Sequence, residues 1–300
     1  MPQPQTEPVT MAIQLARPTA RKRKSPSAAL LLIPALLFLA LLFGGPLVEI
    51  TVRSLSDPTW GLQNFGWVFT TTSNLVVGLR TIVMGLCVTA IALVLSYPVA
   101  YLMTIANTRS RQLLVLGIMI PLWTSLLVRT LAWVVLLQDS GPINDVLEAI
   151  GLGRVPLIRT PFGVALGMTQ VLMPFMVLPL YSAMARIDLR LISAARSLGA
   201  TGVTAFRSIY LPLSRPGIVS GCVSVFVLAL GFFIIPSLLG SPSESLLSSL
   251  IQTQIGSLLA WGHGAALGIS LLAVTVLILL VVGRAAGGVS IIPSQKELDR

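Results

Sequence analysis

Few side chains in this chain of 300 residues could carry out covalent or metal chemistry. His263 is the only histidine, so no histidine cluster can bind a metal, and we expect it to pack beside Trp261. Cys87 and Cys222 each lie inside an apolar run, where cysteine usually acts as a small packing residue. The sequence contains neither the glycine-rich Walker pattern that binds nucleotide phosphates nor a nucleophile elbow. We therefore predict that this chain is not an enzyme and that it binds no metal and no cofactor of its own.

The sequence does offer a docking surface, in the partly polar residues 193–212 (SAARSLGATGVTAFRSIYLP) between two apolar runs. The first part reads as a short helix that stops at Gly199, because glycine adopts the left-handed conformation that ends helices. A second helical stretch carries Phe206 and Ile209 at helical spacing, and we expect Pro212 to close it. Two short helices joined by a turn predict a segment that a partner protein holds.

The composition indicates that the elements carrying this segment lie in a membrane. Hydrophobic residues make up 55% of the chain and charged residues 10%, and the mean hydropathy is +0.90. Soluble proteins carry about 25% charged residues. The net charge of +10 is compatible with nucleic-acid binding, but the basic residues stand mostly at the ends of apolar runs. That placement is typical of membrane orientation, so we expect contact with membrane lipid and no nucleic acid as a partner.

Six apolar runs are long enough to cross a bilayer, which takes roughly 20 residues. The expected spans are residues 28–50, 75–105, 113–137, 162–185, 217–239 and 261–283. The first follows a basic segment but exceeds the roughly 7–15 residues of a signal-peptide core, so we expect it to be retained. The predicted fold class is all-α and polytopic, with a disordered tail at 1–27, a membrane domain at 28–283 and a second tail at 284–300.

The basic residues predict which loops face the cytoplasm. With the N-terminus inside, the cytoplasmic segments hold Arg17, Arg21, Lys22, Arg23, Lys24, Arg109, Arg111, Arg186, Arg190, Arg196, Arg207, Arg215, Arg284, Lys296 and Arg300. The outer segments hold the basic residues Arg53, Arg154 and Arg159 and the acidic residues Asp57, Asp139, Asp145, Glu148 and Glu244. Both termini and the loop 186–215 are therefore expected in the cytoplasm. The outer acids either attract a cationic solute or simply remain outside once basic residues are sorted inward.

Residues 193–212 resemble the cytoplasmic loop of permease subunits of ATP-binding-cassette (ABC) importers. That loop has the form Glu-Ala-Ala, three residues, Gly, nine residues and Ile-x-Leu-Pro. The residues in this register are Ala194, Ala195, Gly199, Ile209, Leu211 and Pro212. Ser193 departs from the pattern, since the family usually has glutamate there. Exposed ion pairs contribute only about 0–1 kcal/mol, so this departure weakens the match only slightly.

The resemblance extends to segments similar to the permeases of spermidine/putrescine importers. These segments are residues 121–133, 141–144, 173–181, 211–217 and 235–240, and the similarity covers roughly residues 60–280. It implies the type I importer fold and a place in the bacterial inner membrane. It also implies a cytoplasmic ABC ATPase dimer that supplies ATP hydrolysis, a second and different permease chain, and a periplasmic or extracellular solute-binding protein.

By the same resemblance, the loop 186–215 couples transport to the ATPase. The residues expected to take part are Asp188, Ser193, Ala194, Ala195, Gly199, Phe206, Ile209, Leu211 and Pro212. The small residues allow close approach, and Phe206 and Ile209 supply apolar anchors. The nearby basic residues Arg190, Arg196 and Arg207 either pair with acids of the ATPase or only set the orientation of the loop.

A solute path is expected among polar and aromatic groups within the spans. The candidates are Tyr97, Trp123, Ser125, Arg129, Trp133, Gln138, Asp139, Gln170 and Tyr181. A polyamine needs carboxylates and aromatic faces, which favours the pair Trp133 and Asp139. Arg129 argues against a cationic solute unless it is a structural residue bonded to backbone carbonyls or to a loop acid. The alternatives are the same machinery for an opine, thiamine, ferric iron or a carboxylate, or an ion-coupled carrier that works alone.

Overall fold

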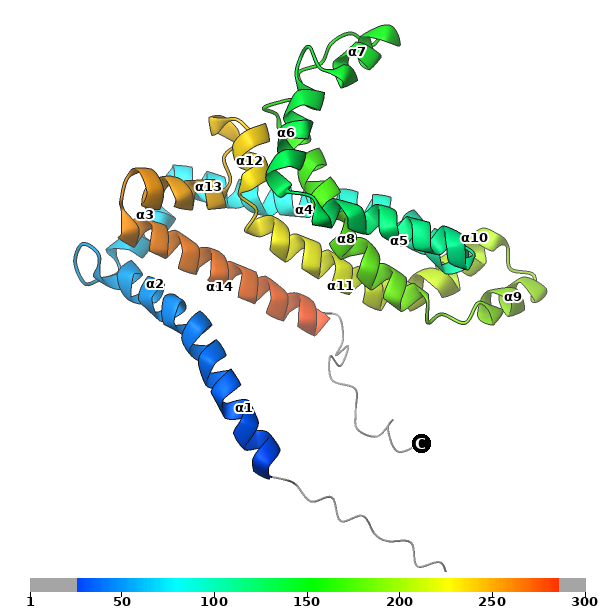
Figure 1. The fold of residues 1–300 in the computed structure, drawn as a ribbon, viewed down its shortest axis with the longest axis horizontal. Helices are drawn as coiled ribbons and strands as arrows, with labels where there is room; N and C mark the ends of the chain where they lie inside the picture. Colours follow the sequence, from blue (N-terminus) through cyan, green and yellow to red (C-terminus); the bar gives the residue numbers. More distant parts are fainter. Residues whose placement is uncertain (1–25, 286–300) are drawn as a thin grey trace, which may run out of the picture. The chain divides into compact units, whose positions relative to one another are not determined.

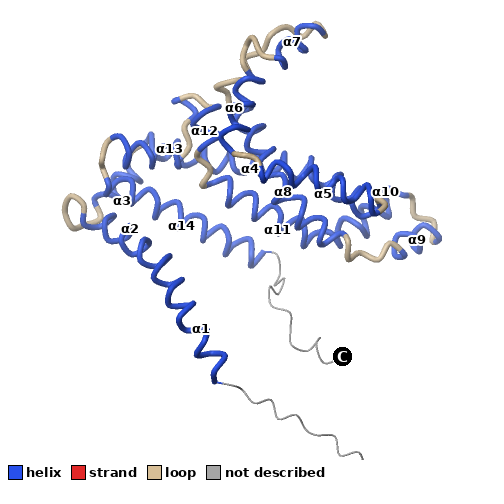
Figure 2. Tube along the Cα trace, in the orientation of Figure 1, coloured by secondary structure: helices blue, strands red, loops and turns tan. Residues whose placement is uncertain are grey.

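The computed structural model describes residues 26–285, with side chains from Ile33 to Arg284, and this part of the chain consists of helices and loops (Figure 2). Six helical stretches within it are long and apolar enough to cross a membrane. They are Ile33–Ser56, Thr72–Ile105, Leu126–Ala149, Pro161–Met184, Gly202–Leu230 and Trp261–Arg284. The predicted all-α class with six spans is thereby confirmed. The tail 286–300 and most of the tail 1–27 lie outside the described residues.

The chain divides into two units, residues 1–48 and 49–300. The described part of the first unit comprises α1 (Pro26–Leu39), a π-helical turn η1 (Ala40–Gly44) and the start of α2 (Gly45–Ser56). None of the side chains described in this unit is buried, and nearly all of them are apolar. Such a surface is stable in lipid, where an apolar helix needs no protein core to cover it.

The second unit contains the end of α2 and all later helices (Figure 1). Its first half comprises α3 (Gln63–Thr70), α4 (Thr72–Ile105), α5 (Thr108–Trp123), α6 (Leu126–Leu137), α7 (Pro142–Ala149) and α8 (Pro161–Met184). Its second half comprises α9 (Arg190–Ser197), α10 (Gly202–Ala205), η2 (Phe206–Tyr210), α11 (Leu211–Leu230), α12 (Ile234–Leu239), η3 (Pro242–Glu244), α13 (Leu247–Gln252), η4 (Thr253–Ser257) and α14 (Trp261–Ala285).

Helices α4, α8 and α11 pack together and form the core of this unit. Fully buried side chains such as Met176 and Leu180 lie between them. Gly217 and Gly221 bring α11 close to α8. A Cβ on Gly217 would stand 2.7 Å from the Ala183 Cβ, and one on Gly221 would stand 2.7 Å from the Met176 sulfur. The two glycines thus form a G-x-x-x-G contact, which lets two membrane helices approach closely.

The third expected span, 113–137, is two helices in the structure. α5 ends at Trp123, and α6 begins at Leu126 after two extended residues, Thr124 and Ser125. Pro121 lies in the last turn of α5 and cannot donate a backbone hydrogen bond. The guanidinium of Arg129 donates to the Thr124 carbonyl at 3.1 Å and so satisfies one backbone group that the break exposes.

The fifth expected span, 217–239, also has different bounds. Its helix begins far earlier, since α10, η2 and α11 form one helical stretch, Gly202–Leu230. The expected stop at Pro212 was wrong. Pro212 lies in the first turn of α11, directly after the wider π-helical turn η2, and the helix continues through it. The stretch ends at Gly231, and the residues that follow form the separate helix α12.

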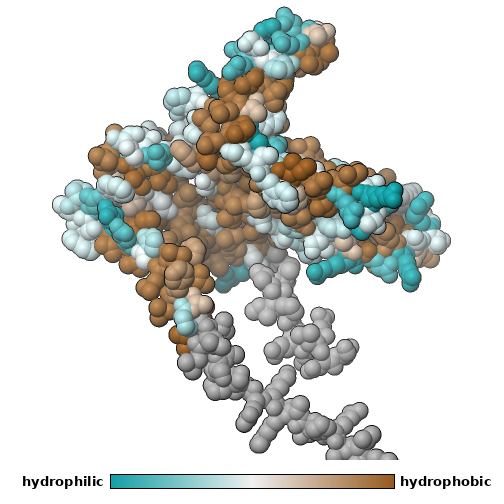
Figure 3. All heavy atoms as spheres, viewed as in Figure 1, coloured by the Kyte–Doolittle hydropathy of each residue, from teal (hydrophilic) through white to brown (hydrophobic). Residues whose placement is uncertain are grey.

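Hydrophobic residues cover much of the helix surface of the second unit (Figure 3). Hydrophilic residues gather around α7, which projects from the side of the long helices, and near α9, which lies at one end of them. An exposed apolar surface along the long helices is the distribution that the hydrocarbon core of a bilayer requires.

Asn64 fastens the loop after α2 to α3. Its side chain is almost fully buried and donates to the Ser54 carbonyl at 2.9 Å and to the Asp57 carbonyl at 2.7 Å. Replacing Asn64 by leucine leaves both carbonyls unpaired and is expected to cost about 1–3 kcal/mol of stability. Thermal unfolding of the detergent-solubilised protein measures this as a lower Tm.

Gln63→Leu is the matched control, because the neighbouring Gln63 is exposed and, within the described part of the chain, its side chain bonds to Thr59 alone. Its Tm is expected to stay close to that of the parent protein. Equal Tm values for the two variants would contradict the assigned role of Asn64.

Candidate coupling loop and solute path

The loop predicted to dock a partner contains the short helix α9. Its start is fixed by Asp188, whose carboxylate accepts a hydrogen bond from the Arg190 backbone N–H at 2.9 Å. The Asp188 carbonyl also accepts from the Leu191 N–H at 3.1 Å. The end of the helix is fixed by Gly199, which has a φ of +89°. The Ala200 N–H closes the turn on the Ala195 carbonyl at 3.0 Å, as in other glycine-terminated helices.

One side of α9 is exposed, while Ile192 on the other side packs against the hydrophobic core. Ser193, Ala194 and Gly199 are exposed, and Leu198 is 90% exposed. Nothing lies within 4 Å of the place where a Gly199 Cβ would be. A small, open surface with an exposed leucine fits a helix that enters the groove of another protein.

The second half of the loop packs inward instead. The hydroxyl of Thr201 caps α10 by accepting from the Thr204 N–H at 3.2 Å. Phe206 and Ile209 are half-buried, and Tyr210 is fully buried. Phe206 touches Tyr101 and Tyr210 through its ring, so it anchors the loop to its own membrane helices. The spacing of these residues did not reveal which way they face. Leu211 and Pro212 lie in the first turn of α11.

The expected solute-path residues do not form one cluster but lie on several helices with different contacts. Trp133 and Gln170 come together, with the indole N–H donating to the Gln170 side-chain oxygen at 3.5 Å. Tyr97 lies on α4, and its hydroxyl is 3.0 Å from the hydroxyl of Ser214 on α11. Trp123 is 85% exposed at the end of α5. Tyr181 is half-buried on α8, and Ser125 and Gln138 flank α6 as its end residues.

Arg129 has both a structural bond and free donors. Its Nη2 donates to the Thr124 carbonyl, as described above, while its buried Nε and Nη1 have no partner within the described residues. Buried guanidinium donors without acceptors are costly. The side chain therefore has capacity for a further acceptor beyond the described residues.

The loop after α6 is organised by Arg154. Its guanidinium donates to the Glu148 carboxylate at 2.9 Å, the Asp145 carboxylate at 3.2 Å and the Asp139 carbonyl at 3.1 Å. The hydrogen bond and charge of Glu148 raise the pKa of Arg154 above its usual value. Within this loop the acidic side chains are thus partly neutralised by Arg154, which reduces their attraction for a cationic solute. The carboxylate of Asp139 remains exposed.

His263 does not pack beside Trp261 as expected. Its ring stacks on Trp67 of α3, with centroids 4.1 Å apart, while Trp261 lies under the guanidinium of Arg53. Partners from distant segments of the chain cannot be read from local spacing. Among the described residues no group of three histidine, cysteine or acidic side chains could hold a metal ion.

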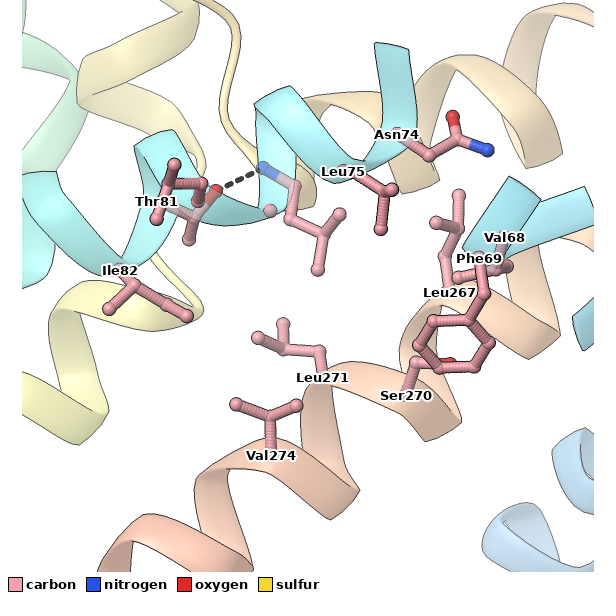
Figure 4. Close-up of a pocket in the computed structure, with 13 residues that line it drawn as sticks. Val68, Phe69, Asn74, Leu75, Thr81, Ile82, Leu267, Ser270, Leu271 and Val274 are labelled. Atoms are coloured by element: carbon pink, nitrogen blue, oxygen red, sulfur yellow. Dashed lines mark hydrogen bonds between the residues drawn. The ribbon is translucent and has the colours of Figure 1, made fainter. Parts of the chain in front are cut away.

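A cavity of about 260 Å³ lies between α3, α4, α13 and α14 (Figure 4). Figure 4 shows Leu75, Ile82 and Leu271 around it, and the Thr81 hydroxyl accepting from the Leu247 N–H at 2.9 Å. Nearly all of its lining is apolar. The cavity lacks the charged groups that a polar solute needs.

The fold and the loop define a membrane-embedded transport component. Residues 71–287 match the family of binding-protein-dependent transport system inner membrane components, and the chain belongs to this family. It is therefore the permease subunit of an ABC importer, a multi-pass inner-membrane protein of a family that is not enzymatic and has no bound cofactor of its own. Membership of this family favours an ABC importer subunit over an ion-coupled carrier that works alone.

Two named relatives are permeases of bacterial transport systems. The chain is 36% identical over 210 residues to the spermidine/putrescine transport system permease protein PotB of Escherichia coli strain K12, covering 69% of this chain and 76% of PotB. It is 31% identical over 194 residues to the inner membrane ABC transporter permease protein YdcU of the same strain, covering 60% of this chain and 62% of YdcU. A solved bacterial alginate ABC transporter, in complex with an alginate-bound periplasmic protein, shares its fold. The TM-score is 0.70 and the identity 18%, over 88% of this chain and 95% of that one.

Proposed function

We propose that this permease forms the translocation path for polyamines of the spermidine/putrescine type and is driven by an ATPase that binds the loop 186–215. The identity to PotB supports the solute class. The proposal that a separate subunit supplies the ATP hydrolysis rests on α9, which is exposed. This helix ends at Gly199, the position where the family pattern has its glycine.

In this mechanism α9 enters a groove on one subunit of a cytoplasmic ABC ATPase dimer. When the ATPases close on ATP, each docked helix moves with its ATPase. The membrane helices then change between inward-open and outward-open arrangements. Ala194, Ala195 and Gly199 give close approach, and Asp188 holds the start of the helix. Leu198, which is almost fully exposed, supplies an apolar contact.

The assembly that this mechanism needs contains further parts. A second permease, a different chain, completes the path between the two subunits, and a periplasmic solute-binding protein delivers the solute to the loop that carries α7. Both termini and the loop 186–215 face the cytoplasm in this orientation, in agreement with the distribution of basic residues.

The polyamine path is proposed to pass Trp133 and Gln170 on the way inward from Asp139. Aromatic faces and side-chain oxygens are suitable contacts for primary ammonium groups. The free donors of Arg129 are proposed to bind an acceptor on the second permease, which leaves less positive charge along the path.

The solute class is tested by reconstituting the complete importer with its solute-binding protein and measuring ATP hydrolysis. Spermidine and putrescine are expected to stimulate hydrolysis, while an opine, thiamine, ferric iron and a carboxylate are not. Stimulation by anionic solutes alone would overturn the polyamine assignment and leave the importer class intact.

Trp133→Ala tests the proposed path. Loss of one cation–π contact of about 0.5–2 kcal/mol is expected to raise the half-saturating polyamine concentration by about two- to thirtyfold. The measurement is the solute dependence of uptake into proteoliposomes. Trp123→Ala is the control, since this indole is exposed at the end of α5. Identical half-saturating concentrations for both variants would remove Trp133 from the path.

A further inference from the structure

Four aromatic rings join the second half of the coupling loop to α4. Tyr97 and Tyr101 come from α4, and Phe206 and Tyr210 come from η2. We name these four rings the aromatic cluster. The ring of Phe206 meets Tyr97 edge-on at 6.0 Å and Tyr101 edge-on at 6.5 Å between centroids. Tyr101 meets Tyr210 edge-on at 5.2 Å, and Phe206 stacks on Tyr210 at 5.7 Å.

Hydroxyl groups add polar links around the aromatic cluster. The Tyr97 hydroxyl and the Ser214 hydroxyl are 3.0 Å apart, which ties α4 to α11. The Tyr210 hydroxyl lies 3.5 Å from that of Thr104 on α4. Tyr210 and Ser214 are fully buried. Edge-on and stacked aromatic pairs add about 0.5–1.5 kcal/mol each beyond their buried area, so four such contacts make a stiff joint.

A π-helical turn lies at the same place as the aromatic cluster. Phe206 and Tyr210 are the first and last residues of η2, the only π-helical turn in the stretch 202–230. A π-helical turn changes the register of the helix that follows it and is frequent at functional positions. Here its two ends carry the rings that face α4.

We propose that the aromatic cluster makes the coupling loop and the helices α4 and α11 move as one body, so that motion of the ATPase-bound α9 reaches the solute path. This inference rests on the proposed docking of the loop 186–215. Tyr101 and Phe206 are positioning residues, because they touch neither the ATPase-facing surface of α9 nor the solute. Without the rings, α9 stays bound to the ATPase but shifts against α4, and ATP is hydrolysed without transport.

The test uses the complete importer in proteoliposomes, with Tyr101→Ala and Phe206→Ala in this chain. Uptake per ATP hydrolysed is expected to fall by about tenfold in each variant. Co-purification of the ATPase and its basal hydrolysis are expected to stay at the parent level. Tyr101→Phe keeps the ring, and its lost hydroxyl has no hydrogen bond among the described contacts. It is expected to restore normal uptake per ATP.

Unchanged uptake per ATP in both alanine variants would overturn the inference. So would loss of the ATPase from the complex, because the rings would then serve docking. If Phe206→Ala does not accumulate, Phe206→Leu keeps the apolar contact and is measured in the same way.

A separate measurement tests the docking itself. Leu198→Cys, with its thiol alkylated by a maleimide that carries a photoreactive group, is expected to cross-link to the ATPase on illumination in the otherwise unchanged importer. Failure of that cross-link would count against the proposed docking, whatever the ring variants do.

Discussion

Solute uptake is expected to fall by about tenfold or more when Gly199 is replaced by valine, because a β-branched residue is strained by about 1–3 kcal/mol in this backbone conformation. The φ of +89° at Gly199 ends α9 and sets its direction relative to α10. The open space around Gly199 means that the strain comes from the backbone and not from a clash. The change therefore alters the shape of the docking surface and leaves the membrane helices in place.

Uptake and solute-stimulated ATP hydrolysis in proteoliposomes measure this effect, with the yield of assembled importer as a check on folding. Gly202→Ala is the matched control, since Gly202 is exposed, has no near neighbour and begins the helix α10. We expect this control to transport normally. Unchanged uptake and unchanged stimulated hydrolysis with Gly199→Val would contradict the coupling role of the loop.

Gly217→Val is expected to cost stability rather than coupling. Besides the Ala183 Cβ, the new side chain would meet the Pro179 carbonyl at 3.0 Å and the Leu180 Cα at 3.1 Å, and backbone atoms cannot move aside cheaply. Overpacking of a tight contact costs about 1–3 kcal/mol. We expect a Tm lower by roughly 3–10 °C in detergent and a smaller yield of folded permease.

Gly268→Val in α14 is the control for this change, because nothing lies within 4 Å of the corresponding Cβ position. Both substitutions place a valine in a membrane helix, so only the packing differs. A Tm for Gly217→Val equal to that of Gly268→Val would show that the close contact between α8 and α11 is not needed for stability.

The fold class was predictable because each membrane helix requires a long apolar run, which composition reveals directly. The breaks were not predictable from the same information. Pro98, Pro174 and Pro179 lie inside continuous helices, whereas Pro121 stands three residues before a break. Whether a proline interrupts a helix depends on which neighbours satisfy the freed backbone groups, and sequence spacing does not contain those neighbours.

The coupling loop was predictable where its structure is local. The start of α9 at Arg190 depends on Asp188 and its end depends on Gly199, and both residues lie only a few positions from the helix. The orientation of Phe206 and the stacking of His263 on Trp67 depend on segments far away along the chain. The G-x-x-x-G pattern of Gly217 and Gly221 was the one sequence signal that could have indicated the contact with α8 in advance.

The uninterrupted helix through Pro212 has a mechanical consequence. The stretch Gly202–Leu230 contains 29 residues, which at about 1.5 Å per residue makes a rod of roughly 43 Å. This length exceeds the roughly 30 Å hydrocarbon thickness of a bilayer. A sideways push of about 2 Å at the end that begins at Gly202 tilts a rod of that length by about 3°. In the proposed mechanism, this single helical stretch supplies the leverage that opens one side of the membrane and closes the other.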